Sequence, residues 1–234
     1  MKAIVQFVPK HFEKAIDVAR SVATFAQIEF KPGMLRVRIT DPVKVLHMDL
    51  ILTPDVFYKC ESEFVFGVNL QMFYKLLKSL DNNDDVEIEA DESVMKINQC
   101  QHHHTLINQE VTGTCDIDHV QGPKVILGTK LLQRYVRALS NAAPVVEIDY
   151  VPTADTLFME SVSSMYRTLF SLNTATSPNE CEQYRKQFIL KFLDTAINPS
   201  LADTVELTLG DSLVLHYANA NVQVWITQAA YTEG

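Results

Sequence analysis

The side chains best suited to metal chemistry gather in one short stretch, in which Cys100 is followed by His102, His103 and His104. Thiolate sulfur and imidazole nitrogen are preferred ligands of Zn²⁺. In an extended strand, however, neighbouring side chains point to opposite faces, so His102 and His104 would share one face and His103 the other. Cys115 lies further along the chain, and no second pair of ligands accompanies it. We therefore expect no metal site, and a metal-dependent enzyme using this stretch is kept only as a third alternative.

No other pattern in the sequence supplies catalytic groups. Asp81, Asp84 and Asp85 fall in a predicted turn, where Asp is favoured because its side chain bonds to the nearby backbone. The seven glycines are isolated, and the sequence contains no phosphate-binding glycine loop, no GxSxG and no HExxH. His216, in a predicted strand, is interpreted as structural. The sequence therefore predicts no catalytic residue and no cofactor, and the protein is not expected to be an enzyme.

Basic side chains form a clearer pattern, because they recur on four predicted helices. Hydrophobic periodicity places these helices at residues 10–23, 69–80, 129–142 and 188–196. In the third helix Lys130, Arg134 and Arg137 fall within an arc of about 60°, and the helix has no acidic residue. A solvated helix face usually mixes both signs of charge, as Glu13 and Asp17 do in the first helix. The third helix therefore favours a functional basic surface.

The whole chain, in contrast to its third helix, is acidic. A formal net charge of −9 argues against a nucleic-acid-binding protein if the charge is spread evenly. A segregated positive surface, by contrast, suits contact with a phosphate backbone without base recognition. No basic platform rich in aromatic residues is visible for single strands, so a duplex is the favoured partner. The alternative is a scaffold whose helices are ordinary solvated elements.

The sequence repeats itself with a shift of 120 residues, since Lys10 corresponds to Lys130 (130 − 10) and Lys14 to Arg134. Residues 66–97 recur in the same way as residues 187–217. Such self-similarity indicates duplication of one structural unit. We predict an α+β protein with two repeated domains, each with two helices on one face of antiparallel sheet. The predicted boundaries are residues 1–110 for the first domain, 111–124 for a connecting linker with glycine and proline, and 125–234 for the second domain.

Composition places this protein among soluble intracellular chains. Hydrophobic residues make up 47%, yet no stretch approaches the ~20 consecutive apolar residues of a membrane span. The N-terminus alternates and then turns helical, unlike a signal peptide. The four cysteines are scattered without CxxC spacing, which is typical of free thiols in a reducing compartment.

Several motifs resemble one known family. They are the segments Phe57-Tyr58-Lys59-Cys60, Phe66-Gly67-Val68-Asn69-Leu70 and Lys75-Leu76-Leu77-Lys78, the hairpin from Val86, the Asp41-Pro42 corner with Lys44-Val45, and the closing strand Val222 to Thr227. Together they resemble the sliding clamps of the proliferating cell nuclear antigen (PCNA) type, in register over essentially the whole chain. The chain is short for that family, which favours a diverged member, a viral one included.

The resemblance implies the DNA-clamp fold and a homotrimeric ring around duplex DNA, bound without sequence preference. It implies that the clamp tethers a DNA polymerase, is opened by a clamp loader and works in the nucleus or a viral replication compartment. The basic residues it places on the inner wall are Lys10, Lys14, Arg20, Lys75, Lys78, Lys130, Arg134, Arg137 and Lys191. Ring closure would pair an edge strand near Thr105 to Thr112 with one near Met165 to Leu172, through interface residues such as Leu106, Ile107, Tyr166 and Leu169. A monomeric or dimeric clamp-fold protein held on DNA by charge is the second alternative.

The resemblance also implies a pocket for short hydrophobic motifs of replication and repair proteins. By position it would draw on Thr40, Val45, His47, Ile117, Val120, Trp225, Ile226 and Gln228. His47 and Gln228 stand where the family usually has an apolar residue and a proline, so we expect the pocket to have altered specificity or to be shallow.

Overall fold

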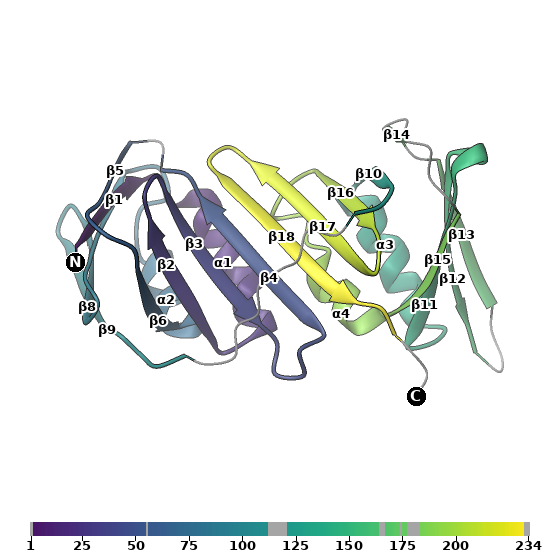
Figure 1. The fold of residues 1–234 in the computed structure, drawn as a ribbon, viewed down its shortest axis with the longest axis horizontal. Helices are drawn as coiled ribbons and strands as arrows, with labels where there is room; N and C mark the ends of the chain where they lie inside the picture. The colour runs from purple at the N-terminus through teal and green to yellow at the C-terminus, as the bar shows by residue number, and fades with distance from the viewer. Residues whose placement is uncertain are drawn as a thin grey trace. The chain divides into compact units, whose positions relative to one another are not determined.

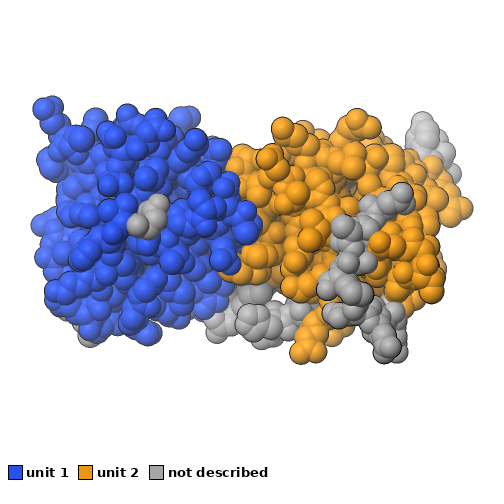
Figure 2. All heavy atoms as spheres, turned by 90° about the horizontal axis from the view of Figure 1, so that it is seen from above, with its two compact units in different colours: residues 1–117, 218–224 blue, residues 118–217, 225–234 orange. Residues whose placement is uncertain are grey.

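The computed structural model describes residues 2–54, 56–111, 121–163, 167–173, 175–176 and 183–231. The chain divides into two compact units. Unit 1 comprises residues 1–117 and 218–224, and unit 2 comprises residues 118–217 and 225–234 (Figure 2). The division between residues 117 and 118 falls inside the predicted linker. No described helix combines the length and apolar content needed to cross a membrane.

Unit 1 is built from antiparallel sheet and two helices (Figure 1). Its elements are β1 (Ala3–Phe7), α1 (Lys10–Val22), β2 (Phe25–Lys31), β3 (Met34–Thr40), β4 (Leu46–Leu52), β5 (Phe57–Cys60), β6 (Phe64–Asn69), α2 (Leu70–Lys78), β7 (Val86–Ala90), β8 (Val94–Gln99) and β9 (His102–Ile107). The strands lie in the orders β5-β1-β7-β8-β9 and β4-β3-β2-β6.

The two helices of unit 1 pack beside each other on one face of these strands, behind them in the view of Figure 1. Their apolar sides carry the contact. Phe12 of α1 meets Phe7 of β1 and Phe73 of α2 edge to face, with ring centroids 5.3 and 6.0 Å apart. Asn69 caps α2, since its side chain accepts a hydrogen bond from the backbone N–H of Met72 at 3.0 Å. Burial of the apolar sides leaves the basic residues of both helices to face outward.

The second half of the chain repeats the same order of elements, and all of them belong to unit 2 except Ala218–Val224 of the last hairpin, which belong to unit 1. They are β10 (Lys124–Gly128), α3 (Thr129–Ser140), β11 (Val145–Val151), the short 3₁₀ helix η1 (Pro152–Ala154), β12 (Thr156–Val162), β13 (Arg167–Asn173), β14 (Ala175–Thr176), β15 (Tyr184–Ile189), α4 (Leu190–Ala196), β16 (Thr204–Leu209), β17 (Ser212–Asn219) and β18 (Val222–Ala229). The orders are β13-β12-β11-β15 and β14-β10-β16-β17, and β18 follows β17 as its hairpin partner.

The strand pairings confirm the internal repeat. β1 pairs with β5 and β7, and β10 pairs with β14 and β16 in the same way. β2 pairs with β3 and β6, and β11 pairs with β12 and β15. In both halves each helix connects the corresponding strands, so the two helices per half predicted from the periodicity are confirmed.

One strand boundary was predicted wrongly. The strand expected near Thr105 to Thr112 is β9, which runs from His102 to Ile107. The chain leaves the sheet after Ile107 because Asn108 and Gln109 bond to Gly67 of β6 instead. The side chain of Asn108 accepts from Gly67 N at 2.7 Å, and Gln109 N donates to Gly67 O at 3.1 Å. A Cβ atom at Gly67 would lie 1.9 Å from the carbonyl oxygen of Gln109, so only glycine fits there.

Candidate nucleic-acid interface

The four helices carry most of the segregated positive charge. They hold nine of the chain's 20 basic residues and three of its 29 acidic residues, which are Glu13, Asp17 and Asp194. The helices therefore sum to +6, and the rest of the chain, with 11 basic and 26 acidic residues, sums to −15. The nine basic residues are the nine predicted for the inner wall. Their placement on helices is thus a property of the fold, whereas their contact with DNA stays a prediction.

Most of these helix side chains carry no ion-pair partner among the described residues. The unpaired ones are Lys10, Lys14, Lys75, Lys78, Lys130, Arg134 and Lys191. All except Lys14, which is half-buried, are exposed. An unpaired exposed cation keeps its full charge for an external phosphate, because no local carboxylate has to be displaced first. Unit 1 contributes four of these side chains and unit 2 three.

Arg20 is the first exception. Its guanidinium pairs with Asp17 at 2.6 Å and donates to the Gln71 side chain of α2 at 3.1 Å. It also stacks over the Tyr74 ring, with its central carbon 4.3 Å from the ring centroid. Lys78 lies over the same ring at 5.6 Å. Arg20 therefore joins α1 to α2, and its charge is partly neutralised where it stands.

Arg137 is the second exception. Its Nε lies 3.1 Å from Oδ1 of Asp194 on α4, so this cation joins the two helices of unit 2. Arg134, one turn earlier, has no carboxylate partner and lies 5.8 Å from the centroid of the Tyr135 ring. Within the predicted arc of three basic residues, Lys130 and Arg134 are therefore the freely charged pair.

Basic residues on the sheets behave differently. Arg36 of β3 bonds to both oxygens of Asp49 on β4, and Arg38 pairs with Glu29 on β2. Glu29 and Asp49 are only 5% and 7% exposed, so these are partly buried pairs that hold the strands together. Lys31 pairs with Glu29 as well, at 2.8 Å, so the three cations of this cluster are all held by carboxylates of the strands.

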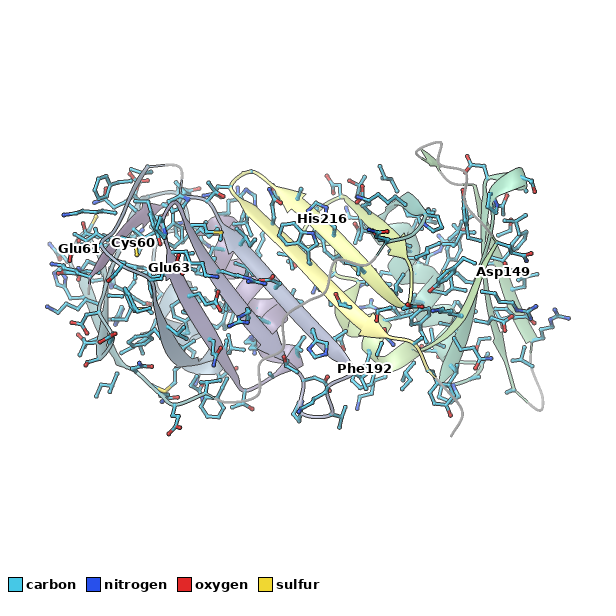
Figure 3. All side chains as sticks on the ribbon, viewed as in Figure 1. Cys60, Glu61, Glu63, Asp149, Phe192 and His216 are labelled. Carbon is cyan, nitrogen blue, oxygen red and sulfur yellow. The ribbon has the colours of Figure 1, made fainter. Side chains whose placement is uncertain are left out.

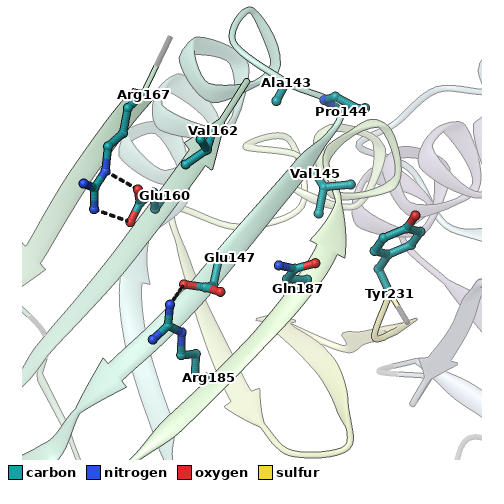
Figure 4. A pocket seen from close by; sticks show the side chains of 10 residues that line it. All are labelled: Ala143, Pro144, Val145, Glu147, Glu160, Val162, Arg167, Arg185, Gln187 and Tyr231. Carbon is teal, nitrogen blue, oxygen red and sulfur yellow. Dashed lines mark hydrogen bonds and ion pairs between the residues drawn. The ribbon is translucent and has the colours of Figure 1, made fainter. Parts of the chain in front are cut away.

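The strands of unit 2 show the same neutralisation. A depression of about 530 Å³ lies on this sheet. Among the side chains that line it, Arg167 faces Glu160 and Arg185 faces Glu147 (Figure 4). Arg185 lies 2.6 Å from Glu147, and Arg167 bonds to both oxygens of Glu160. Because Glu147 and Glu160 are directly opposite on β11 and β12, the two arginines relieve a like-charge pair. The free basic charge of the described chain is thus concentrated on helices.

Each unit also ends in an edge strand bearing exposed apolar side chains. β9 closes one end of its sheet in unit 1, and Ile107 on it is 75% exposed, whereas Leu106 is buried. β13 closes one end of its sheet in unit 2, and Leu169 on it is 51% exposed. Tyr166 lies outside the described residues. An unpaired strand edge can pair with a strand of another chain. The exposed edges of β9 and β13 therefore suit the predicted subunit interface, which stays a proposal.

Comparisons with known proteins agree on one fold. Residues 9–113 match the family model described as proliferating cell nuclear antigen, N-terminal domain. PCNA from Archaeoglobus fulgidus, in a structure described as the C-terminal region of FEN-1 bound to A. fulgidus PCNA, aligns with a TM-score of 0.86 and 16% identity over 99% of both chains. PCNA from Entamoeba histolytica aligns with a TM-score of 0.87 and 16% identity, over 98% of this chain and 99% of that one. The chain has the clamp fold.

A curated relative adds a sequence match. A DNA polymerase sliding clamp of Nitrosopumilus maritimus (strain SCM1) is 33% identical over 97 residues. The match covers 41% of this chain and 35% of the relative, so it spans about a third of the relative's length. The comparisons confirm the predicted resemblance and the clamp fold.

The residues predicted for the partner pocket are divided between the two units. In unit 1, Oγ1 of Thr40 lies 3.1 Å from Nδ1 of His47, and both flank the turn that holds Val45. Asp41 fixes that turn, because its carboxylate accepts from the backbone N–H groups of Val43, Val45 and Leu46 at 3.1, 2.7 and 2.6 Å. The Asp41-Pro42 corner, one of the motifs that resemble the family, therefore fixes the backbone of the turn before β4.

In unit 2, Trp225 stacks on His216, with ring centroids 4.6 Å apart and planes 11° apart. His216 points to the face of the strands away from α4 (Figure 3), whereas its neighbour Tyr217 bonds to the carbonyl of Ala196 in α4. Ile226 and Gln228 are buried, and the Gln228 side chain donates to Ile189 O at 3.0 Å. Ile117 and Val120 lie outside the described residues. The pocket itself stays a prediction.

The sequence did not predict the Arg20 and Arg137 attachments. Each joins side chains 51 or 57 residues apart on two helices, and only the packed fold brings them together. The sequence did contain one signal for these contacts, namely an acidic or amide residue, such as Asp194, on the other basic helix of the same half.

Proposed function

We propose that the chain is a DNA sliding clamp that encircles duplex DNA, tethers a DNA polymerase and docks replication and repair proteins. The observation that carries this proposal is the charge partition, with +6 on the helices against −15 elsewhere, in a PCNA-like clamp fold. An acidic protein with one positive surface contacts phosphates there and is repelled from DNA everywhere else.

The chemistry of the basic residues suits sliding. Lysine is a flexible point charge, and six of the seven unpaired helix cations are lysines. Such contacts bind phosphates without recognising bases, so moving along the duplex by one base pair exchanges equivalent contacts. Retention on DNA would then come from enclosure and not from tight binding.

Enclosure requires several copies. We propose a homotrimer in which β9 of one copy pairs with β13 of the next, burying Ile107 and Leu169 and removing both open edges. Partner docking is supported by the description of the A. fulgidus relative as bound to the C-terminal region of FEN-1. A clamp loader to open the ring, and work in a nucleus or viral replication compartment, belong to the same proposal.

The test is retention on linear duplex DNA whose two ends are blocked with streptavidin after the protein has threaded on. Enclosure predicts that the protein survives a high-salt wash and is released when the DNA is cut, because a ring must leave over an end. Loss in the wash itself would favour the second alternative, a monomer or dimer held by charge, since charge-based binding falls steeply with salt. A DNA polymerase added to the blocked DNA should synthesise longer products with the retained protein than without it.

A further inference from the structure

The hairpin of β8 and β9 brings two imidazoles onto one face of an edge strand. His102 and His104 are two residues apart on β9, with ring centroids 6.4 Å apart and planes 24° apart. His103 points to the opposite face, where its Nδ1 lies 3.1 Å from Oδ1 of Asn98. The alternation expected of a strand is therefore realised at this triplet.

Neither imidazole of the pair is committed to a strong contact. His102 is exposed and has no hydrogen-bond partner within the described residues. Nε2 of His104 lies 3.4 Å from Oγ of Ser79, which follows the last residue of α2. That distance is long for a hydrogen bond and leaves the ring nitrogen available. The C-terminal end of α2, with its partial negative charge, also favours a cation nearby.

The backbone holds the pair in place. His102 is opposite Gln99 in the register of β8 and β9, and His104 is opposite Ile97. Gln99 is buried and its side chain bonds to the backbone of Asp81 and Asp84, which anchors the hairpin end to the rest of unit 1. The two imidazoles therefore project from a fixed strand, so little freedom is lost when they bind a common ion.

Although the sequence alone led us to expect no metal site in this stretch, we propose from the geometry of the pair that His102 and His104 form a two-histidine chelate for a divalent transition-metal ion of the Zn²⁺, Ni²⁺ or Cu²⁺ class. Imidazole suits these ions, and rotation of the two rings about their side-chain bonds brings one nitrogen of each to the ~2.0–2.1 Å of a Zn–N bond. Water completes the coordination, because the described residues contain no group of three or more metal-binding side chains. The site is thus exchangeable, unlike a structural or catalytic metal centre, and it lies on β9, the strand that the proposed ring pairs with a second copy.

The test uses the untagged, chelator-treated chain, titrated with NiCl₂ and with ZnCl₂ in a calorimeter at pH 7.5. One ion should bind per chain. His102→Ala and His104→Ala should each weaken binding by at least ~10-fold, since even second-shell partners of metal ligands are worth about 10–100-fold.

Two matched variants complete the design. His103→Ala removes an imidazole from the opposite face of the same strand, and Cys100→Ser removes the exposed thiol of the preceding turn. Both should bind the ion as the unmodified chain does. Binding that survives loss of both His102 and His104, or that disappears in either control, would overturn the assignment, as would the absence of any binding. Circular dichroism confirms that each variant is folded.

Discussion

Nε of Arg137 on α3 lies 3.1 Å from Oδ1 of Asp194 on α4, so the basic surface of unit 2 contains its own counter-charge. Asp194 is the one acidic residue on the two helices of that unit. The pair is largely exposed, and an exposed pair contributes little to stability. Its main consequence is to withhold one cation from an external phosphate.

Asp194→Asn should therefore strengthen DNA binding. It releases Arg137, so the salt dependence of binding should steepen by about one phosphate contact. Fluorescence anisotropy on a short duplex over a range of KCl concentrations measures this. Asp211→Asn is the matched control, because it removes the same charge and releases Lys186 of β15 from a 2.7 Å pair with the turn between β16 and β17. A steeper dependence in both variants would show that total charge, and not the helix surface, controls binding.

Neutralising Lys130 and Arg134 together, as in K130A/R134A, should weaken DNA binding. Both side chains are exposed and unpaired among the described residues, so their loss should reduce the salt slope by about two and weaken all duplex sequences alike. The free energy of unfolding should change by no more than about 0.5 kcal/mol. The control K59A/K96A removes two exposed lysines from the strands of unit 1 and should bind DNA as before. An unchanged slope for K130A/R134A would remove α3 from the interface.

Gly67→Ala should destabilise the protein by about 1–3 kcal/mol, as overpacking typically does. The added Cβ would lie 1.9 Å from the Gln109 carbonyl oxygen, so β6 and the segment after β9 have to separate. Gly128→Ala is the control, because the nearest atom to a Cβ there is 4.0 Å away. Urea unfolding of both variants measures this difference in stability. Equal midpoints would contradict the prediction, because they would mean that the backbone near Gly67 accommodates a Cβ atom without loss of stability.

The stability of unit 1 should depend on His11 below neutral pH. Burial, reinforced by Lys14 and Lys10, lowers the pKa of His11 from its ordinary value of 6.5. The unfolded chain therefore takes up this proton first, and the free energy of unfolding falls as pH drops below about 6.5. His11→Gln removes the titration, so its stability should decline less between pH 8 and pH 5. Parallel declines for the two proteins in urea titrations would contradict this role.

The sequence was sufficient for the parts of the fold that depend on local periodicity. The helix at Lys10–Val22 followed from the spacing of Phe12 and Ile16 on one side, and the repeat followed from matching positions such as Lys10 and Lys130. Turn residues and alternation then located most strands. These signals are local, so they can be interpreted without knowledge of the tertiary structure.

The remainder depends on contacts between distant residues. The start of β9 at His102 was missed because three consecutive histidines carry no apolar alternation, and the end at Ile107 depends on Asn108 reaching Gly67. The Arg137–Asp194 pair likewise requires the relative rotation of two packed helices, which neither helix determines alone. Basic candidates could thus be named from sequence, but not the carboxylates that neutralise some of them.

The ring is the central claim, and the molecular mass in solution tests it most directly. Light scattering coupled to size exclusion should give about three times the 26.5 kDa of one chain. Ile107→Asp on the exposed edge of β9 should shift the mass toward one copy without unfolding the protein, because a charge would be buried in the proposed joint. A mass that stays near 26.5 kDa at concentrations where the protein supports polymerase would contradict a closed ring.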